Sequence, residues 1–330
     1  MGSITFMKQQ RLSLVTSCHW RDYELLDSGN LRKFERFGPY RFIRPEPQAI
    51  WRPRNDANDW QANGIFVPGR IGKNDQEQGD GGGWQLSEQL PASWQLSYQS
   101  LRFLARPTPF RHLGFFPEQA AHWDWCADAV RAFTAYHNRP PRILNLFAYS
   151  GLASLHAADA GAEVTHLDAS KKAVAQAFEN RDLCALQDAP IRFITDDATS
   201  FVDRELRRKN CYDGIILDPP KYGRGPKGEF WRIEHHLAPL LKKCRQLLSK
   251  DKLFFVLTIY AIRASSLAAH YALADLFDGM GGSLESGELA LHETPIAKED
   301  PKSAECEVPQ RLISQANFAR WQSNLAMKQT

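Results

Sequence analysis

Three aspartates follow apolar segments of this 330-residue chain, at positions where buried strands are expected to end. Asp168 ends the segment EVTHLD, Asp197 lies in TDDA, and Asp218 follows GIIL at the start of DPPKYG. A carboxylate beside a low-dielectric interior is costly unless it is paired or hydrogen-bonded. Helix capping is the alternative use for Asp168 and Asp218. We expect instead that the aspartates bind a ligand.

Alternating apolar and amphipathic segments must position these carboxylates. Strands are predicted at 142–147, 163–168, 191–195, 212–218 and 252–260, and helices at 152–161, 170–186, 199–209, within 230–249 and at 266–280. This alternation is typical of a parallel sheet with helices on both faces, a Rossmann-like doubly wound α/β fold. Ligands in such folds lie outside the carboxyl ends of the strands. The three aspartates are all expected at that edge.

The first third of the chain has a different composition. Up to Arg106 it is rich in Trp, Pro, Gly and Arg, with extended candidates RDYELLD, YRFIRP, AIWRP, GIFVPG and SLRFLARP. Turn residues separate these segments, which favours a small antiparallel β domain at 1–106. The remainder, 107–330, is predicted to form the α/β domain. The segment NDQEQGDGGGWQ is predicted to be a loop, since it lacks the Gly-Lys-Ser/Thr ending of a P-loop.

Composition excludes several classes of protein. Hydrophobic residues make up 43% and charged residues 24%, and the longest apolar run, 253–262, is shorter than the ~20 residues of a membrane span. The first residues lack a secretory signal pattern, so we expect a cytoplasmic protein without a membrane partner. Six cysteines occur singly, which predicts neither a disulfide framework nor zinc. His235 and His236 also lack a partner at metal-binding spacing, so no metal is expected.

The position of Asp168 indicates a nucleoside ligand. It lies 17 residues after Gly151, where a carboxylate can accept hydrogen bonds from both ribose hydroxyls. Dinucleotide enzymes share this arrangement but need several glycines, so that bare amides approach the pyrophosphate. Here FAYSG has one glycine, and Phe147 and Tyr149 would obstruct a diphosphate. A ligand without phosphates, such as S-adenosylmethionine, is favoured over NAD.

At this point the chain resembles a known family. The segments GFFPEQ, NLFAYSG, LDAS, DDA and DPPKYGRGPKGE occur in the order found in class I S-adenosylmethionine-dependent methyltransferases. The branch with DPPK followed by Phe or Tyr and Gly is that of bacterial 23S ribosomal RNA large-subunit methyltransferases. LLDSGNLRKFERFGPYRFIRPEPQAIW also resembles the N-terminal β segment of that branch. Each segment alone is weak, but the ordered set between Arg111 and about Tyr260 is specific.

The resemblance implies roles for matching residues. Its cofactor-binding set is Asn145, Phe147, Ala148, Gly151, Asp168, Ser170, Asp197, Ala198 and Gln119. In this set Asp168 would hold the ribose and Asp197, with the amide of Ala198, would read the adenine. Gln119 would close over the cofactor. For Phe147 and Ala148, plain core packing is the alternative.

A second set surrounds the expected methyl group. It consists of Asp218, Pro219, Pro220, Lys221 and Tyr222. Asp218 would accept hydrogen bonds from the cofactor's ammonium group or from the acceptor, while the prolines fix the backbone. Alignment of the reactants is the main requirement of such a transfer. Lys221 is either a contact to an acceptor phosphate or a solvated loop residue.

The acceptor is the least determined part of the reaction. Methylation at carbon 5 of cytosine needs a thiolate near the cofactor, but the segment LTIYAIRASS, after the fifth strand, has none, and Cys211 precedes the fourth strand. We therefore predict direct transfer to an RNA base without a cysteine intermediate, and the resemblance implies a base of ribosomal RNA. A protein or small-molecule acceptor, and a non-catalytic RNA-binding protein that retains the pocket, remain alternatives.

Two features of the N-terminal region bear on RNA. Seven of nine tryptophans precede Val130, and Met1 to Arg54 carries ten Lys or Arg against five Asp or Glu. Such rings and charges could stack on unpaired bases and neutralise phosphates. Core packing is the favoured alternative for most of the tryptophans, because a small β domain needs large apolar side chains. The net charge of +3 decides nothing by itself.

Overall fold

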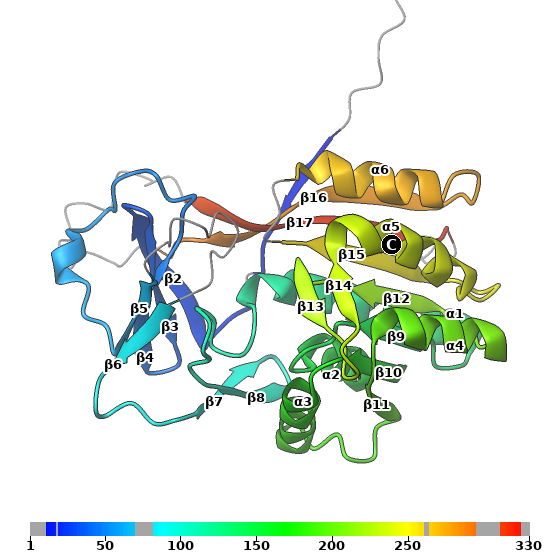
Figure 1. Cartoon of the computed structure of the whole chain (residues 1–330), viewed down its shortest axis with the longest axis horizontal. Helices are drawn as coiled ribbons and strands as arrows, with labels where there is room; N and C mark the ends of the chain where they lie inside the picture. Colours follow the sequence, from blue (N-terminus) through cyan, green and yellow to red (C-terminus); the bar gives the residue numbers. More distant parts are fainter. Residues whose placement is uncertain (1–10, 18, 70–81, 261–263, 295–310, 325–330) are drawn as a thin grey trace, which may run out of the picture.

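Two sheets of different size make up the molecule. The computed structural model describes residues 11–17, 19–69, 82–260, 264–294 and 311–324. Figure 1 shows an N-terminal β region beside a larger α/β region that carries the helices. This arrangement confirms the doubly wound sheet and the smaller antiparallel region. The domain boundary at residue 106 stays a prediction.

The larger sheet has eight strands in the order β1-β16-β17-β15-β12-β9-β10-β11. They are β1 (Ser13–Val15), β9 (Arg142–Leu146), β10 (Glu163–Asp168), β11 (Ile191–Thr195), β12 (Gly214–Leu217), β15 (Phe254–Ile259), β16 (Ser283–His292) and β17 (Leu312–Gln322). β17 runs antiparallel to β15 and β16, while the other neighbours are parallel. The sequence did not predict β1, β16 or β17. Strand β1 joins the large sheet although it lies within 1–106.

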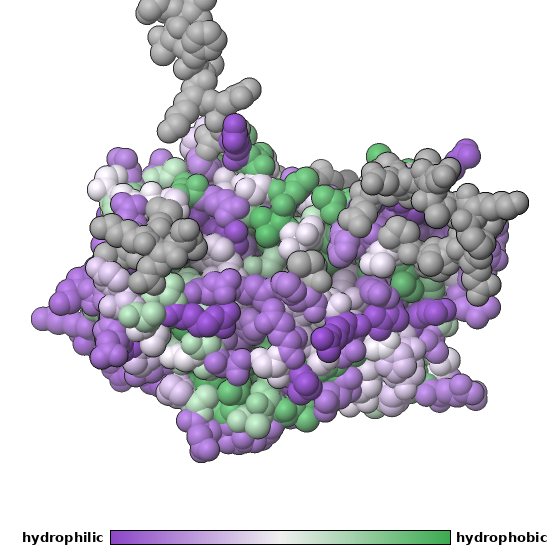
Figure 2. All heavy atoms as spheres, turned by 180° about the vertical axis from the view of Figure 1, so that it is seen from behind, coloured by the Kyte–Doolittle hydropathy of each residue, from purple (hydrophilic) through white to green (hydrophobic). Residues whose placement is uncertain are grey.

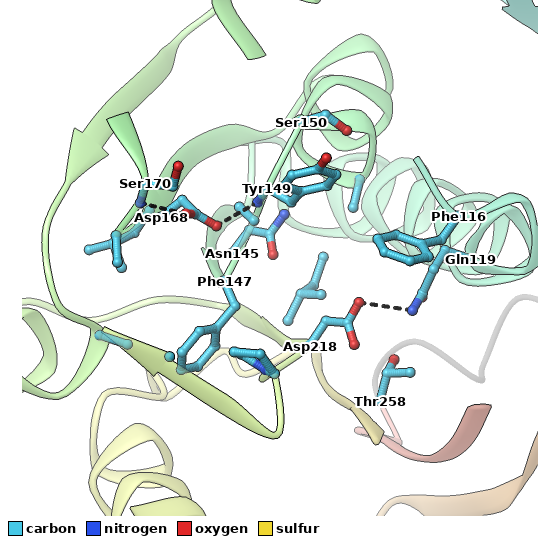
Figure 3. A pocket seen from close by; sticks show the side chains of 18 of the residues that line it. Phe116, Gln119, Asn145, Phe147, Tyr149, Ser150, Asp168, Ser170, Asp218 and Thr258 are labelled. Carbon is cyan, nitrogen blue, oxygen red and sulfur yellow. Dashed lines mark hydrogen bonds between the residues drawn. The ribbon is translucent and has the colours of Figure 1, made fainter. Parts of the chain in front are cut away.

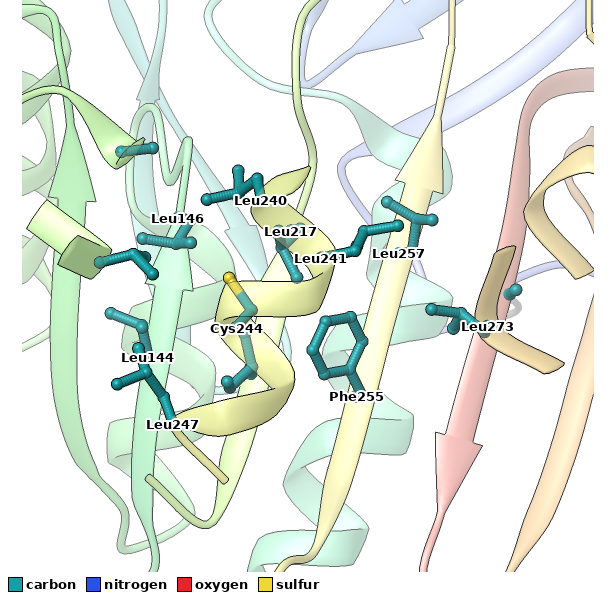
Figure 4. Close-up of a cluster of buried hydrophobic side chains, with 14 of the residues drawn as sticks. Leu144, Leu146, Leu217, Leu240, Leu241, Cys244, Leu247, Phe255, Leu257 and Leu273 are labelled. Carbon is teal, nitrogen blue, oxygen red and sulfur yellow. The ribbon is translucent and has the colours of Figure 1, made fainter. Parts of the chain in front are cut away.

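Helices cover both faces of this sheet. They are α1 (Ala120–His137), α2 (Leu152–Asp159), α3 (Lys171–Leu183), α4 (Ala198–Arg208), α5 (Ile233–Gln246) and α6 (Ser266–Leu276). On one face, Leu144 and Phe255 pack with residues of α4, α5 and α6 (Figure 4). On the other, Ile143 and Phe254 pack with residues of α1 and α2. Successive strand residues therefore point to opposite helix layers, as the apolar runs predicted.

The N-terminal region is built on a five-stranded sheet. Its strands are β2 (Tyr23–Gly29), β3 (Arg32–Phe37), β4 (Tyr40–Pro45), β5 (Gly64–Pro68) and β6 (Gly82–Leu86), and the hairpin of β7 (Trp94–Tyr98) and β8 (Leu101–Ala105) follows. Only β4 and β5 pair in parallel. AIWRP forms no strand. Of the predicted glycine-rich loop, residues 74–81 lie outside the described residues and 82–85 belong to β6.

The two regions share a core. One buried cluster joins Tyr23 and Phe42 of the N-terminal sheet to Leu152 of α2 and Leu291 of β16. The amide of Thr294, just after β16, donates to the carbonyl of Leu25 at 2.9 Å. Trp60, Trp94 and Trp123 are buried, which supports core packing for these rings. The N-terminal sheet is thus held firmly beside the α/β region.

Two short elements lie near the carboxyl ends of the strands of the larger sheet. The 3₁₀ helix η2 (Pro117–Gln119) leads into α1, and the hairpin of β13 (Tyr222–Arg224) and β14 (Phe230–Arg232) follows DPPK. A further 3₁₀ turn, η1 (Ala57–Asp59), lies in the N-terminal region. The sequence predicted neither η2 nor the hairpin. Both elements bring side chains to the carboxyl ends of the strands.

None of the helices that the structure describes is long and apolar enough to cross a membrane. From behind, Figure 2 shows hydrophilic side chains over much of the described surface, with apolar areas between them.

Candidate functional site

A cavity of about 320 Å³ opens at the carboxyl ends of the strands. Its walls come from the segments after β9, β10, β11, β12 and β15, and from η2 and α1. Ten of the predicted site residues line it: Gln119, Asn145, Phe147, Ala148, Asp168, Ser170, Asp197, Ala198, Asp218 and Pro220. Figure 3 shows several of them around the central space. Gln119 and Asp218, which are 99 positions apart in the chain, are joined by a hydrogen bond.

Four predicted residues do not line the cavity. Gly151 immediately precedes α2 and has a φ of 88°, and a Cβ there would lie 2.9 Å from the Cβ of Ala177. Pro219 is buried, and the Lys221 ammonium lies 4.9 Å from the ring centre of Tyr222. Gly151 therefore shapes the loop through its backbone, while Lys221 and Tyr222 pack on one another beside the cavity.

The loop between β9 and α2 is wound tightly. Phe147 and Tyr149 have φ values of 57° and 47°, in the left-handed region that costs a residue with a Cβ about 1–2 kcal/mol. This winding turns the Tyr149 amide toward Asp168, whose Oδ2 accepts its hydrogen bond at 2.9 Å. Asn145 is buried and donates through Nδ2 to Ser154 Oγ at 2.9 Å. The loop is thus fixed by neighbours rather than by several glycines.

Both carboxylate oxygens of Asp168 are held by backbone amides. Oδ1 accepts from the amide of Ser170 at 2.8 Å, and Oδ2 accepts from Tyr149. Burial raises the pKa of Asp168, and the two amides counter that rise. Because each oxygen has a second lone pair, the carboxylate can still accept hydroxyl hydrogens. Ser170, not Asp168, caps α3, since its side chain accepts the amide of Ala173.

Helix capping was the alternative role for Asp168 and Asp218, but of the three strand-end aspartates the one that caps a helix is Asp197. Asp197 caps α4, and its Oδ1 accepts the amide of Ser200 at 2.8 Å. The preceding Asp196 accepts the Asp197 amide and pairs with Arg204 at 2.7 Å. The third strand end therefore presents an ordered carboxylate and the start of a helix, next to Ala198.

Asp218 has a contrasting environment. The amide Nε2 of Gln119 donates to its Oδ2 at 3.0 Å, as the dashed line in Figure 3 shows. Its Oδ1 is shielded from solvent and has no hydrogen-bond partner among the described residues. Burial, and secondarily the nearby carboxylate of Glu118, raise the pKa of Asp218 to about 8. An unpaired buried carboxylate of this kind is costly, so the site favours a ligand that donates to it or carries positive charge.

Several aromatic side chains complete the cavity. They are His112, Phe116, Tyr149, Trp231 and Tyr260. Sequence reasoning gave a role only to Tyr149 among them, as an obstacle to a diphosphate. The ring centre of Phe116 lies 6.0 Å from that of Tyr149 and 6.0 Å from that of Tyr260. GFFPEQ and the loop YSG contained two of these rings, but only the fold shows that they face one space.

Trp231 ties the hairpin to the DPPK segment. Its Nε1 donates to the carbonyl of Pro220 at 2.7 Å, and its ring lies 4.9 Å from that of Phe147. The hairpin therefore fixes both the backbone after Asp218 and one wall of the cavity. Its sequence lacks the long alternation that predicts a strand, which is why it was missed.

Cysteine and metal chemistry find little support in the described residues. Cys126 lines the cavity, but burial raises the pKa of its thiol to about 12. Cys211 is exposed and precedes β12, at the edge opposite the cavity. Among the described residues no group of three or more His, Cys, Asp or Glu side chains is arranged to hold a metal ion.

Known proteins share this architecture. A crystal structure of an S-adenosylmethionine-dependent methyltransferase from Agrobacterium tumefaciens is 42% identical, with a TM-score of 0.82, and the match covers 97% of this chain and 99% of that one. The protein SMU.776, solved in complex with S-adenosylhomocysteine, has a TM-score of 0.65 at 14% identity, covering 92% of this chain and 76% of its own. The second likeness shows the fold alone.

Sequence comparisons match part of the chain. Residues 121–252 match the family described as Conserved hypothetical protein 95. The ribosomal RNA large subunit methyltransferase K/L of Hahella chejuensis is 36% identical over 122 residues, which are 36% of this chain and 16% of that protein. The chain thus spans only a small part of the length of this curated relative.

Proposed function

The chain belongs to the S-adenosylmethionine-dependent methyltransferases, and on this premise we propose that it methylates an RNA base by direct transfer. The acceptor would be ribosomal RNA, the cysteine intermediate would be absent, and the site of action would be the cytoplasm. The observation that carries the proposal is the unpaired oxygen of Asp218 inside a cavity that also holds Asp168 and Asp197.

The residues present fit the cofactor. Asp168 has lone pairs left for two ribose hydroxyls, and the loop with Phe147 and Tyr149 leaves no glycine-rich turn for a pyrophosphate. Asp197 and Ala198 would face the adenine, while Asn145 and Ala148 would border the methionine portion. When bound, S-adenosylmethionine supplies a methyl group activated by a sulfonium charge.

The protein's own residues hold the reactants in place. The free oxygen of Asp218 would accept a hydrogen bond from the cofactor's ammonium group, and Gln119 holds the other oxygen in place. Trp231 and Phe147 keep the Pro220 backbone and the cavity wall from moving. Fixed geometry of this kind can supply about 7–11 kcal/mol of a transfer barrier. Aromatic rings around the cavity suit a flat base.

RNA as the acceptor is supported by the relative from Hahella chejuensis, which is named for ribosomal RNA. A thiolate mechanism is disfavoured because Cys126 is held neutral and Cys211 lies at the other edge. Lys221 and Arg232 both lie over the ring of Tyr222, close to the cavity, where phosphates could approach. A protein or small-molecule acceptor is the rival that the experiment must exclude.

The test is methyl transfer to RNA from cells that lack the gene. Purified protein and isotope-labelled S-adenosylmethionine should place label in one nucleoside of that RNA, identified by mass spectrometry, and should label wild-type RNA far less. Asp218→Asn serves as the inactive control. RNA binding should weaken steeply with salt, because phosphate contacts release counterions. Label found only in protein or small molecules would refute the proposal, and binding without transfer would favour an RNA-binding protein.

A further inference from the structure

A second unpaired polar atom lies in the wall of the same cavity. His122, in the first turn of α1, is only 3% exposed and lines the cavity. Its Nε2 is shielded from solvent and has no hydrogen-bond partner among the described residues. Neither the motifs nor the function proposed above gives this side chain a role.

The proton of His122 can be assigned from its neighbour. Nδ1 lies 3.5 Å from Nη1 of Arg320, and an arginine can only donate hydrogen bonds. Nδ1 must therefore be the acceptor. Burial, with Arg320 nearby, also holds the pKa of His122 well below its usual value, so the ring is neutral. The remaining proton is on Nε2, which makes that atom a buried donor.

The surroundings of His122 favour a negatively charged partner for this donor. Arg320 is nearly buried, and its charge lies behind the imidazole, although Glu285 pairs with it at 2.6 Å. The positive end of the α1 dipole lies in the same turn. Asp218, in the same cavity, offers the opposite: a buried oxygen that needs a donor or a cation. Two residues of the cavity wall thus carry one unsatisfied donor and one unsatisfied acceptor, both shielded from solvent.

We propose that His122 donates to the carboxylate of the cofactor's amino-acid end, while Asp218 accepts from its ammonium group. This inference rests on the proposed cofactor and extends it to a residue outside the quoted motifs. An α-amino acid presents both partners on one carbon, which matches a donor and an acceptor in one cavity. Neither atom is open to solvent, so binding requires a side-chain shift in the wall, a common change on ligand binding.

The test compares two ligands that differ in the amino-acid end. S-adenosylhomocysteine carries it, and 5′-methylthioadenosine lacks it. Calorimetry of the wild-type protein should give tighter binding of S-adenosylhomocysteine, by tenfold or more. His122→Phe should lose most of that difference while its affinity for 5′-methylthioadenosine stays within about twofold, and His122→Asn, which keeps a donor, should recover part of it. The loss of one hydrogen bond to a charged group predicts a change of this size.

A control on the same helix separates binding from folding. His137→Phe is the same substitution at the end of α1, at a residue that does not line the cavity, and it should leave both affinities unchanged. Unaltered preference for S-adenosylhomocysteine in His122→Phe would overturn the inference, as would equal weakening of both ligands. If the wild-type protein binds both ligands but methylates no RNA, only the proposed acceptor fails.

Discussion

The two ends of the cavity are prepared to different degrees. At the ribose end, both oxygens of Asp168 already accept backbone amides, at 2.8 and 2.9 Å. At the transfer end, Asp218 has one oxygen held by Gln119 and one with no partner. The ribose end is therefore preorganised to position the nucleoside before it binds. The transfer end has an unsatisfied acceptor, which a bound ligand would satisfy.

The largest effect should come from removing the charge at the transfer end. Asp218→Asn should lower the rate of methyl transfer by about 10²–10³-fold, the loss typical of one electrostatic contact in a reaction site. Steady-state kinetics with the RNA acceptor measure it. The variant should unfold no more easily than the wild type, because an asparagine has no charge that must be buried without a partner. A near-normal rate of methyl transfer in this variant would show that the unpaired carboxylate of Asp218 does not contribute to catalysis.

At the ribose end the effect should fall on binding. Asp168→Ala removes the acceptor for the ribose hydroxyls and leaves the amides of Tyr149 and Ser170 without their partner. We expect affinity for S-adenosylhomocysteine to fall by tenfold to a few hundredfold, from one or two hydrogen bonds to a charged group. Titration calorimetry gives the value. Unchanged affinity in a folded variant would refute the assignment of Asp168.

The contrast also predicts a dependence on pH. The folded-state pKa of Asp218 is raised to about 8, above its unfolded value near 4, so the ligand-free fold gains stability as pH falls between these values. A cationic ligand needs the ionised form. Its affinity should therefore drop below pH 8, by up to tenfold per unit, with a proton released on binding.

Calorimetry in buffers of different ionisation enthalpy counts that proton. In Asp218→Asn the release should vanish, while Asp168→Asn should keep it. Proton uptake instead of release, or none in the wild type at pH 6.5, contradicts the raised pKa.

The smallest effect is expected away from both ends. Cys211→Ser should keep methyl transfer within about twofold, because the exposed thiol precedes β12 and lies outside the cavity. The same kinetic assay applies. Complete loss of transfer in a folded Cys211→Ser variant would restore a thiol mechanism.

Sequence patterns predicted the frame better than the cavity wall. Strands such as β9 and β12 were found because buried parallel strands are continuous apolar runs, and the ends of α2 and α3 because Gly161 and Ser170 mark them. The same reasoning placed Asp168 and Asp218. It missed β17, because residues along this strand do not alternate regularly between buried and exposed, and only its antiparallel pairing with β15 and β16 defines it.

The residues of the cavity that the sequence did not predict were missed for a common reason. His122, Phe116 and Trp231 reach the cavity through tertiary packing of η2, α1 and the β13–β14 hairpin, which no local period encodes. A buried polar atom without a partner, as in His122, is visible only once the neighbours are known. The family resemblance pointed to the segment GFFPEQ, but not to the residue three positions beyond it.

The most direct test of the central claim is a crystal structure grown with S-adenosylhomocysteine and an excess of NAD. The account predicts the thioether nucleoside in the cavity, with its ribose on Asp168 and its amino-acid end between Asp218 and His122. A cavity filled by NAD instead, or the nucleoside bound elsewhere, would contradict it.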